Sequence, residues 1–241
     1  MKILTLFGSI SDERIYAPLC ESLGKKHQVK MEVISAHRNP VELEKVLETS
    51  DCDIIIGGAG LAAHLPGVVA SKTSKPVFGI PVDGNFGGLD AFLSIVQMPF
   101  GVPVLSIAPN KENLIEEFLD IVTIELFKTK TFEIIINPKI LDYEYVTLEL
   151  FRATKYAESI GYNVEVLGKP TGLSPAIVYV NDDREILLEG PCIHIPILDK
   201  SHKLNPNSAN QFMNSASQGG MWCGANNSRN AMSFWNKLEQ L

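Results

Sequence analysis

The first half of the chain alternates short apolar runs with segments of helical spacing. The apolar runs are Ile3–Phe7, Met31–Ile34, Ile54–Ile56, Val77–Ile80 and Val102–Ala108. The helical segments between them are Ser11–Lys25, Pro40–Thr49, Ala62–Ser71 and Leu89–Gln97. Short apolar strands that alternate with helices form parallel βαβ units, in which helices cover both faces of the sheet. We therefore predict an α/β fold with a parallel sheet, and right-handed crossovers place the loops after its first four strands along one edge.

The second half starts a new alternation. Glu112–Phe127 is predicted to be a helix that closes the first unit, and Lys128–Thr131 a linker after it. The elements predicted next are the strand Phe132–Ile136, the helix Tyr143–Ile160, the strands Val164–Leu167, Ala176–Val180 and Ile186–Leu188, and a last helix Arg229–Leu241. No sequence repeat is visible. We therefore predict two domains, residues 1–127 and a smaller α/β module of residues 128–241.

The order of elements in this second module resembles the thioredoxin pattern. Leu173–Pro175 precedes Ala176–Val180, which is predicted to form a hairpin with Ile186–Leu188 across an Asn181–Asp183 turn. No C-x-x-C motif lies near Asn137, so redox chemistry is not expected. We interpret the module as a scaffold or a modifier of assembly, and a second active site is the alternative.

The composition narrows the function class. The formal net charge is −7 and no run of Lys or Arg is present, which argues against a general nucleic-acid binder. Apolar residues make up 45% of the chain, yet no apolar run approaches the roughly 20 residues of a membrane helix. The apolar start ends at Gly8, too early for a secretory signal, so we expect a cytoplasmic protein. The cysteines, Cys20, Cys52, Cys192 and Cys223, form no C-x-x-C pair and are expected to be reduced thiols rather than metal ligands.

Two predicted loops of the first half carry polar groups suited to a phosphorylated sugar. Gly8–Asp12 follows the first strand, where glycine permits a tight turn, serines supply hydroxyl groups and a helix start favours an anion. Asp12 there could cap the helix or accept hydrogen bonds from a ribose diol. Ser35–Pro40 follows the second strand and contains His37 and Arg38. A guanidinium beside a hydroxyl suits a phosphate, and His37 could move a proton or be purely structural.

Two further segments follow the third and fourth strands. Gly57–Gly67 lacks the lysine of a P-loop and the G-x-G-x-x-G order of a dinucleotide site, so we reject both nucleotide interpretations. Its small residues, followed by His64–Gly67, predict a tight, partly apolar wall for a carboxylate or carbon dioxide. His64 could instead be a packed residue. Pro81–Pro103, with its Gln97–Pro99 turn, could by itself be a packing or subunit interface.

Together the four segments resemble the class I N5-carboxyaminoimidazole ribonucleotide mutases, also called the catalytic subunit of phosphoribosylaminoimidazole carboxylase. The family pattern is G-S-x-S-D, S-A-H-R-x-P, G-A-G-G-A-A-H-L-P-G and D-S-L-L-S-I-V-Q-M-P-x-G-V-P-V. This chain carries the four segments in that order, at nearly those spacings, over about residues 1–127. In addition, Gly224–Ala231 resembles the family's C-terminal G-A-x-N-A-A helix start, which would make the second module an insertion and let the last helix pack on the first domain.

The resemblance implies a three-layer α/β/α sandwich that assembles into an octamer and uses no metal or organic cofactor. It implies a ribonucleotide substrate that is decarboxylated and recarboxylated through trapped carbon dioxide, with His37 as the proton shuttle. Ser9, Ser11, Ser35 and Arg38 would hold the 5′-phosphate, and Asp12 the ribose hydroxyls. Ala59, Gly60, His64 and Leu65 would line the pocket for the carboxylate and imidazole.

Three departures from the family pattern keep other functions open. Leu61 replaces the second glycine of the Gly-Gly pair and could narrow the pocket. The loop Asp83–Gly88 is one residue shorter than usual and lacks the usual serine, and Glu13 stands where an aromatic or apolar residue often follows Asp12. The alternatives are a carboxylase or mutase acting on a related heterocycle and a non-catalytic sugar-phosphate-binding protein.

Overall fold

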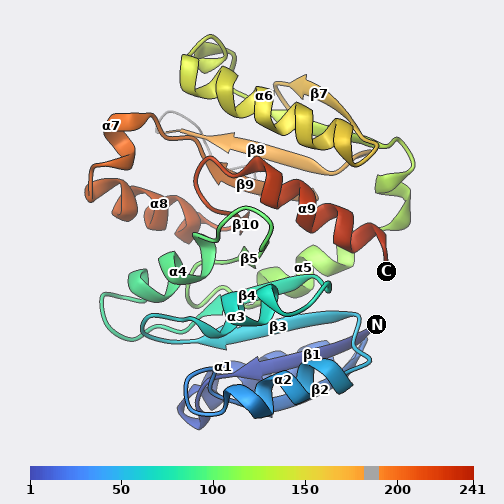
Figure 1. Ribbon diagram of the computed structural model, residues 1–241, viewed down its shortest axis with the longest axis vertical. Helices are drawn as coiled ribbons and strands as arrows, with labels where there is room; N and C mark the ends of the chain where they lie inside the picture. Colours follow the sequence, from blue (N-terminus) through green and yellow to red (C-terminus); the bar gives the residue numbers. More distant parts are fainter. Residues whose placement is uncertain (182–189) are drawn as a thin grey trace.

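One sheet runs through the whole molecule (Figure 1). The computed structural model describes residues 1–181 and 190–241. Within these residues the strands lie side by side in the order β2 (Gln28–Val33), β1 (Lys2–Phe7), β3 (Ile54–Ala59), β4 (Val77–Pro81), β5 (Leu105–Ser106), β10 (Met221–Trp222), β9 (Cys192–Pro196), β8 (Ala176–Val180), β6 (Thr131–Ile135) and β7 (Asn163–Leu167). Neighbouring strands pair in parallel except at the centre, where β5 and β10 are antiparallel.

The helices connect these strands and cover the sheet. They are α1 (Glu13–Leu23), α2 (Pro40–Thr49), α3 (Leu65–Ser71), α4 (Leu89–Val96), α5 (Asn113–Ile121), α6 (Glu144–Ser159), α7 (Lys200–Lys203), α8 (Asn207–Gln218) and α9 (Ser228–Glu239). Short 3₁₀ turns cover Ile10–Asp12, Ile124–Phe127 and Pro138–Ile140.

The predicted alternation of strands and helices in the first half is confirmed, with two corrections. The strand expected over Val102–Ala108 is reduced to β5, because Pro103 and Pro109 flank it and proline has no N–H for a strand ladder. The helix expected over Glu112–Phe127 ends at Ile121, and the extended Val122 separates it from the 3₁₀ turn.

The thioredoxin-like interpretation of the second half is wrong. β8 pairs in parallel with β6 on one side and with β9 on the other, whereas the thioredoxin pattern needs an antiparallel partner for this strand. The predicted partner Ile186–Leu188 lies outside the described residues. The polar stretch after Pro196, which carried no predicted element before the last helix, contains α7, α8 and β10.

The two halves of the sheet have the same strand order around the central pair. Outward from the centre, the first half runs β5, β4, β3, β1, β2 and the second runs β10, β9, β8, β6, β7. Both β4 and β9 end in proline, Pro81 and Pro196. The registers make Ser106 and Trp222 equivalent, and these two residues face each other across the antiparallel ladder. A pseudo-two-fold axis therefore passes through this pair. The chain contains two copies of one structural repeat, although no repeat is visible in its sequence.

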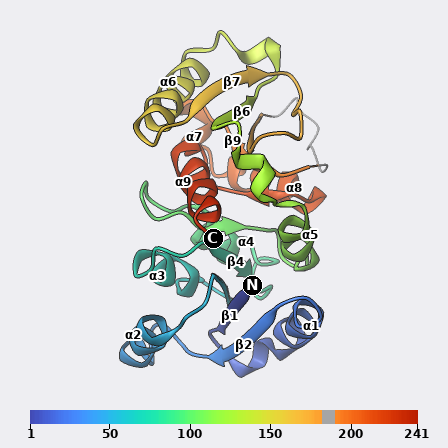
Figure 2. The ribbon, with the colours of Figure 1, turned by 90° about the vertical axis from the view of Figure 1, so that its right-hand side faces the viewer.

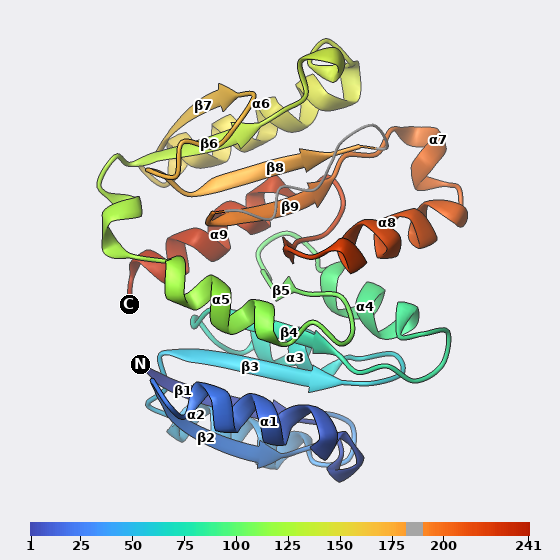
Figure 3. The same cartoon turned by 180° about the vertical axis from the view of Figure 1, so that it is seen from behind.

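Helices lie on both faces of the strongly twisted sheet. Apolar side chains of α1, α5, α6 and α9 form one core that continues through both halves, and α2, α3, α4 and α8 cover the other face. Because of the twist, α6 and α9 lie in front of the upper strands in Figure 1. Helices α1 and α5 lie behind the lower strands in that view and are in front in Figure 3, which shows the molecule from the opposite side. Figure 2 shows α2 and α3 on one side of the lower strands and α1 and α5 on the other. In the described part of the chain, no helix has the length and apolarity to cross a bilayer.

The last helix touches both halves. α9 packs on α6 and β8 of the second half. Its Phe234 ring lies 5.0 Å from the ring of Phe78, and its Trp235 ring lies 5.2 Å from that of Phe118, both centroid to centroid. The contact of the last helix with residues 1–127 is therefore present, and the division of the chain at residue 128 stays a prediction.

Candidate functional site

A pocket of about 280 Å³ lies at the carboxyl edge of the first half of the sheet. The loops after β1, β2 and β3 form it, as expected for neighbouring parallel strands. Its lining residues are Gly8, Ser9, Ser11, Asp12, Ser35, Ala36, His37, Ala59, Gly60, Leu61, Ala62, Ala63, His64 and Leu65. Every predicted site residue except Arg38 is in this set. Residues 81–103, which contain the fourth motif, contribute no lining residue.

The first loop presents two hydroxyl groups and a buried carboxylate. Ser9 caps the 3₁₀ turn, because its Oγ accepts a hydrogen bond from the Ser11 backbone N–H at 3.2 Å and another from Ser11 Oγ at 2.8 Å. Asp12 makes no capping hydrogen bond to α1, so its side chain is not the helix cap. It is only 7% exposed, and one of its oxygens accepts from Ser11 Oγ at 3.2 Å. Burial raises the pKa of Asp12, although the Ser11 hydrogen bond opposes this. A carboxylate in such a place is suited to accept hydrogen bonds from neutral hydroxyl groups.

The second loop carries Arg38 toward the first. The Arg38 backbone N–H donates to Ser35 Oγ at 3.3 Å, and the Asn39 N–H donates to the Ser35 carbonyl at 2.9 Å. The Arg38 guanidinium donates to the carbonyl of Gly8 at 3.2 Å and so ties the two loops together. Arg38 therefore stands beside the pocket rather than in its lining. The turn ends at Pro40, the first residue of α2, as the sequence predicted.

His37 and His64 meet across the pocket from different loops. Their ring centroids are 5.0 Å apart and the ring planes are at 76°, an edge-to-face arrangement. Both side chains are exposed. His64 directly precedes α3, and its carbonyl accepts the first helical hydrogen bond from Val68 at 2.9 Å. The sequence predicted both residues for the site but did not predict that the two rings touch.

The third loop has a strained residue at its tip. Leu61 has a φ of 53°, in the left-handed region that costs an L-residue roughly 1–2 kcal/mol, and its side chain is 59% exposed. This is the position that glycine holds in the family pattern. Gly57, within β3, lies against α3, and a β-carbon there would come 3.3 Å from Pro66 Cα. Gly57 therefore lets α3 pack closely on the strand, a role that sequence reasoning missed.

The loops after β6 and β7, which correspond to those after β1 and β2, lack these groups. Asn137 and Pro138 follow β6, and Gly168–Thr171 follows β7, without a serine, histidine and arginine run. Residues 168–175 also connect β7 to β8 without a helix, whereas α2 connects β2 to β3. Among the described residues, the site chemistry is thus confined to the first copy of the repeat.

Comparison with known proteins agrees with the pocket chemistry. Residues 2–114 match the family model described as AIR carboxylase. N5-carboxyaminoimidazole ribonucleotide mutase of Methanocaldococcus jannaschii is 50% identical over 107 residues, which are 44% of this chain and 68% of that protein. The protein of the same name from Escherichia coli is 43% identical over 117 residues, 46% of this chain and 68% of that protein. A crystal structure of Treponema denticola PurE aligns with 66% of this chain and 90% of that chain, at 19% identity and a TM-score of 0.44, a similarity too weak to support an argument. The sequence matches establish that this chain belongs to the AIR carboxylase family.

Proposed function

We propose that this protein converts N5-carboxyaminoimidazole ribonucleotide into its 4-carboxy isomer, a carboxyl transfer of purine biosynthesis. The observation that carries the proposal is the meeting of three family motifs at one pocket: serines and Asp12 from the first loop, His37 from the second, and the Ala59–Leu65 wall from the third. The relatives that match this chain bear the name of that activity.

The pocket suits one ribonucleotide. Its volume of about 280 Å³ is just below the roughly 300–1,000 Å³ usual for small-molecule sites. The 5′-phosphate would bind between Ser9, Ser11, Ser35 and the Arg38 guanidinium, whose charge offsets the phosphate locally in a chain of net charge −7. The ribose hydroxyls would donate to Asp12.

The base would then lie between the two histidines and the wall of Ala59, Gly60 and Leu65. In the first step the bond between the exocyclic nitrogen and the carboxyl carbon breaks while His37, as imidazolium, gives a proton to that nitrogen. This releases carbon dioxide and 5-aminoimidazole ribonucleotide. C4 next forms a bond to the carbon of the trapped carbon dioxide, and the neutral His37 removes the C4 proton. One proton is given and one taken, and the small apolar wall would keep carbon dioxide in contact with the ring.

A spectrophotometric assay tests this function. Separate reactions would contain the carbamate substrate, or 5-aminoimidazole ribonucleotide with bicarbonate, and would follow the absorbance of the 4-carboxy product. We expect turnover of the carbamate, and a loss of about 10²–10⁴-fold in kcat for His37→Asn, the usual contribution of a general acid–base group. The matched control is His202→Asn in α7, which should leave kcat unchanged. Normal turnover by His37→Asn would refute the role of this residue.

The same assay separates the alternatives. Turnover only with bicarbonate indicates a direct carboxylase, and turnover of neither substrate refutes the catalytic proposal. A rise in melting temperature with 5-aminoimidazole ribonucleotide, without turnover, would indicate a sugar-phosphate-binding protein. We further propose assembly into a homo-octamer, by resemblance to the family, which light scattering of the full chain would test. Exposed apolar residues on three loops of the carboxyl edge, Ile10, Leu61 and Phe86, support an assembled state.

A further inference from the structure

The start of α9 binds a loop that belongs to the other half of the molecule. The Asn230 side chain accepts a hydrogen bond from the Gly101 backbone N–H at 2.9 Å and donates to the carbonyls of Pro99 at 2.9 Å and Met98 at 3.4 Å. Asn227, the N-cap of α9, also donates to the Met98 carbonyl, at 3.0 Å. Asn230 is 0% exposed. A buried amide with its donors and acceptor all used holds the main chain of residues 98–101 in one position.

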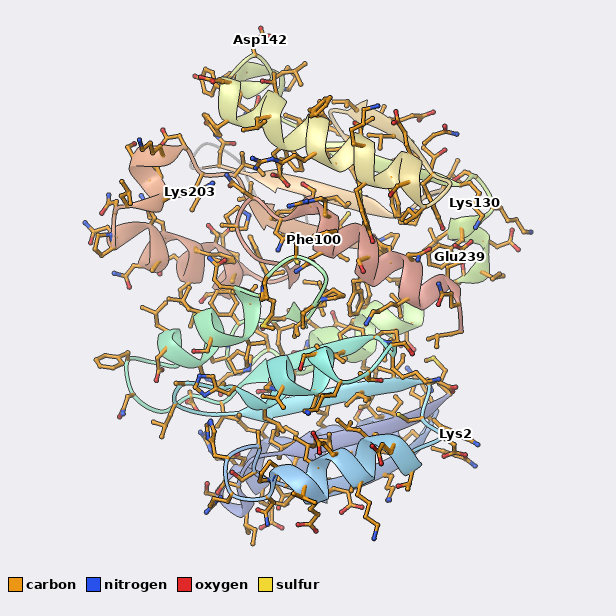
Figure 4. The ribbon with its side chains drawn as sticks, viewed as in Figure 1. Lys2, Phe100, Lys130, Asp142, Lys203 and Glu239 are labelled. Atoms are coloured by element: carbon orange, nitrogen blue, oxygen red, sulfur yellow. The ribbon has the colours of Figure 1, made fainter. Side chains whose placement is uncertain are left out.

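Ring contacts support the same loop. The Arg229 guanidinium lies 4.1 Å from the centroid of the Phe100 ring, and the Tyr156 ring of α6 lies 5.5 Å from it on centroids. Phe100 lies near the centre of the view in Figure 4, where the loop after α4 reaches α9. The contacts of this loop to the second half therefore come from two helices, α6 and α9.

The loop in turn touches the helix that carries part of the pocket. Met98 lies over Gly67 of α3, so closely that a β-carbon on Gly67 would come 3.0 Å from the Met98 sulfur. Met98 also packs against the apolar cluster that includes Ala63 and Leu65, both in the pocket lining. Gly67 is three residues after His64, within the first turn of α3. The position of Met98 is thus linked, through its contact with Gly67, to the first turn of α3, which begins at Leu65 directly after His64.

α9 holds the other end of α3 as well. The Lys237 ammonium donates to the carbonyls of Thr73 at 3.3 Å and Lys75 at 3.4 Å, in the segment between α3 and β4. Among the described residues, no hydrogen bond joins α9 to the loops after β1 and β2, which would hold the phosphate, and Arg38 is tied to Gly8 instead. The second half therefore supports the base side of the pocket and leaves the phosphate side to the first half.

We propose that Asn230 is a positioning residue for the carboxyl transfer: it fixes residues 98–101, and through Met98 it sets the place of α3 and of His64 and Leu65 against the substrate base. This inference rests on the proposed function. It assigns a role to the second copy of the repeat, which holds part of the pocket of the first copy in position. It predicts that substitution of Asn230 lowers kcat more than it weakens ribonucleotide binding, because Asn230 does not hold the loops after β1 and β2 that would bind the phosphate.

The test compares Asn230→Ala and Asn230→Asp with a matched control, Ser228→Ala. Asp keeps the acceptor for Gly101 but loses the donors to Pro99 and Met98. Ser228 is on the same turn of α9 and is also 0% exposed, but its backbone N–H and hydroxyl bond to Glu149 within the second half, at 2.9 and 2.7 Å. The measurements are melting temperature, kcat, KM, the Kd of 5-aminoimidazole ribonucleotide, and the imidazole Hε1 resonance of His64 by NMR. Kinetics are recorded well below the lowest melting temperature.

Both Asn230 variants should lose about tenfold to a hundredfold in kcat, with Kd within about threefold of the wild type and a shifted His64 resonance, since small displacements in a site are costly to rate. Ser228→Ala should lose melting temperature but keep kcat and the His64 resonance. A kcat for Asn230→Ala equal to that of Ser228→Ala, or a rise in KM alone, overturns the proposal. If the Asn230 variants do not fold, Met98→Ala breaks the next contact in the same path and must give the same kcat loss.

The outcome is separable from that of the proposed function. A wild-type protein without turnover refutes the function, and the His64 resonance then decides the positioning role by itself. A resonance that moves in Asn230→Ala but not in Ser228→Ala supports the role. A resonance unmoved in both overturns it.

Discussion

The left-handed backbone of Leu61 makes a sharp prediction about stability. Residues with a β-carbon pay roughly 1–2 kcal/mol in this region, and glycine pays nothing there. Glycine instead loses about 0.4–1 kcal/mol relative to alanine, because its unfolded chain is more flexible. At the Leu61 φ of 53° the first effect exceeds the second, so glycine should be more stable than alanine by about 0.5–1 kcal/mol.

The comparison must be between Leu61→Gly and Leu61→Ala. The wild-type leucine is 59% exposed, so removing its partly buried side chain costs about 1 kcal/mol in either variant and would mask the backbone effect. Both variants lack that side chain and differ only in the β-carbon. Ala62→Gly is the matched control, since Ala62 is not in the left-handed region, and it should lose about 0.5–1 kcal/mol.

Urea unfolding of these proteins measures the effect. With a denaturant slope of about 3 kcal/mol/M, a difference of 0.5–1 kcal/mol moves the midpoint by about 0.2–0.3 M. Leu61→Gly should unfold at a higher urea concentration than Leu61→Ala, and Ala62→Gly at a lower concentration than the wild type. A Leu61→Gly protein less stable than Leu61→Ala would refute the reasoning, because it would mean that residue 61 has an ordinary backbone conformation.

Three other changes test the pocket and the core. Arg38→Ala should raise KM about 10–100-fold with little change in kcat, because hydrogen bonds to charged groups contribute about 1.5–3 kcal/mol. Steady-state kinetics measures both constants, and an unchanged KM would contradict phosphate binding by Arg38. Burial raises the pKa of Asp12, so stability falls as pH rises between the ordinary and the raised value. Asp12→Asn should therefore raise the melting temperature by a few degrees at pH 7 but not below pH 4, and it should weaken ribonucleotide binding. Calorimetry at both pH values measures the two melting temperatures, and an equal shift at both would contradict the burial argument. Gly79→Ala would place a β-carbon 2.2 Å from Cγ2 of Ile95, which should lower the free energy of unfolding in urea by about 1–3 kcal/mol. The control is Gly84→Ala, where a β-carbon has no atom within 4 Å, and equal stability of the two variants would count against this packing.

Much of the candidate site could be predicted from local patterns. Short apolar strands ended by Gly8, Ser35 and Gly60 indicated parallel strands, and the carboxyl ends of such strands share an edge. The grouping of the site residues at one edge could therefore be predicted without knowing any contact between them. Leu61 was recognised as a departure from the family pattern, but its left-handed backbone and the contact of His37 with His64 depend on how the loops fold against each other.

The second half shows where local patterns are not enough. β10 has two residues, Met221 and Trp222, and no sequence periodicity can identify so short a strand. α8 is rich in Asn and Ser, which have low helix propensity, and it is helical because Phe212 packs against Phe92 of α4 with ring centroids 4.9 Å apart. The sequence does not distinguish a parallel from an antiparallel partner for Ala176–Val180, and that choice led to the wrong thioredoxin-like interpretation.

The sequence alone determined the order of strands and helices in the first half, the edge on which the site lies, and the residues around the pocket. These features follow from periodicity, turn residues and motif spacing, all of which are local along the chain. The tertiary structure decided that β5 pairs with β10, that the two halves form a pseudo-two-fold repeat in one sheet, and that Asn230 holds the loop at Met98. These pairings join residues more than a hundred positions apart, and they depend on the shape and hydrogen-bonding groups of both partners, which no window of sequence contains.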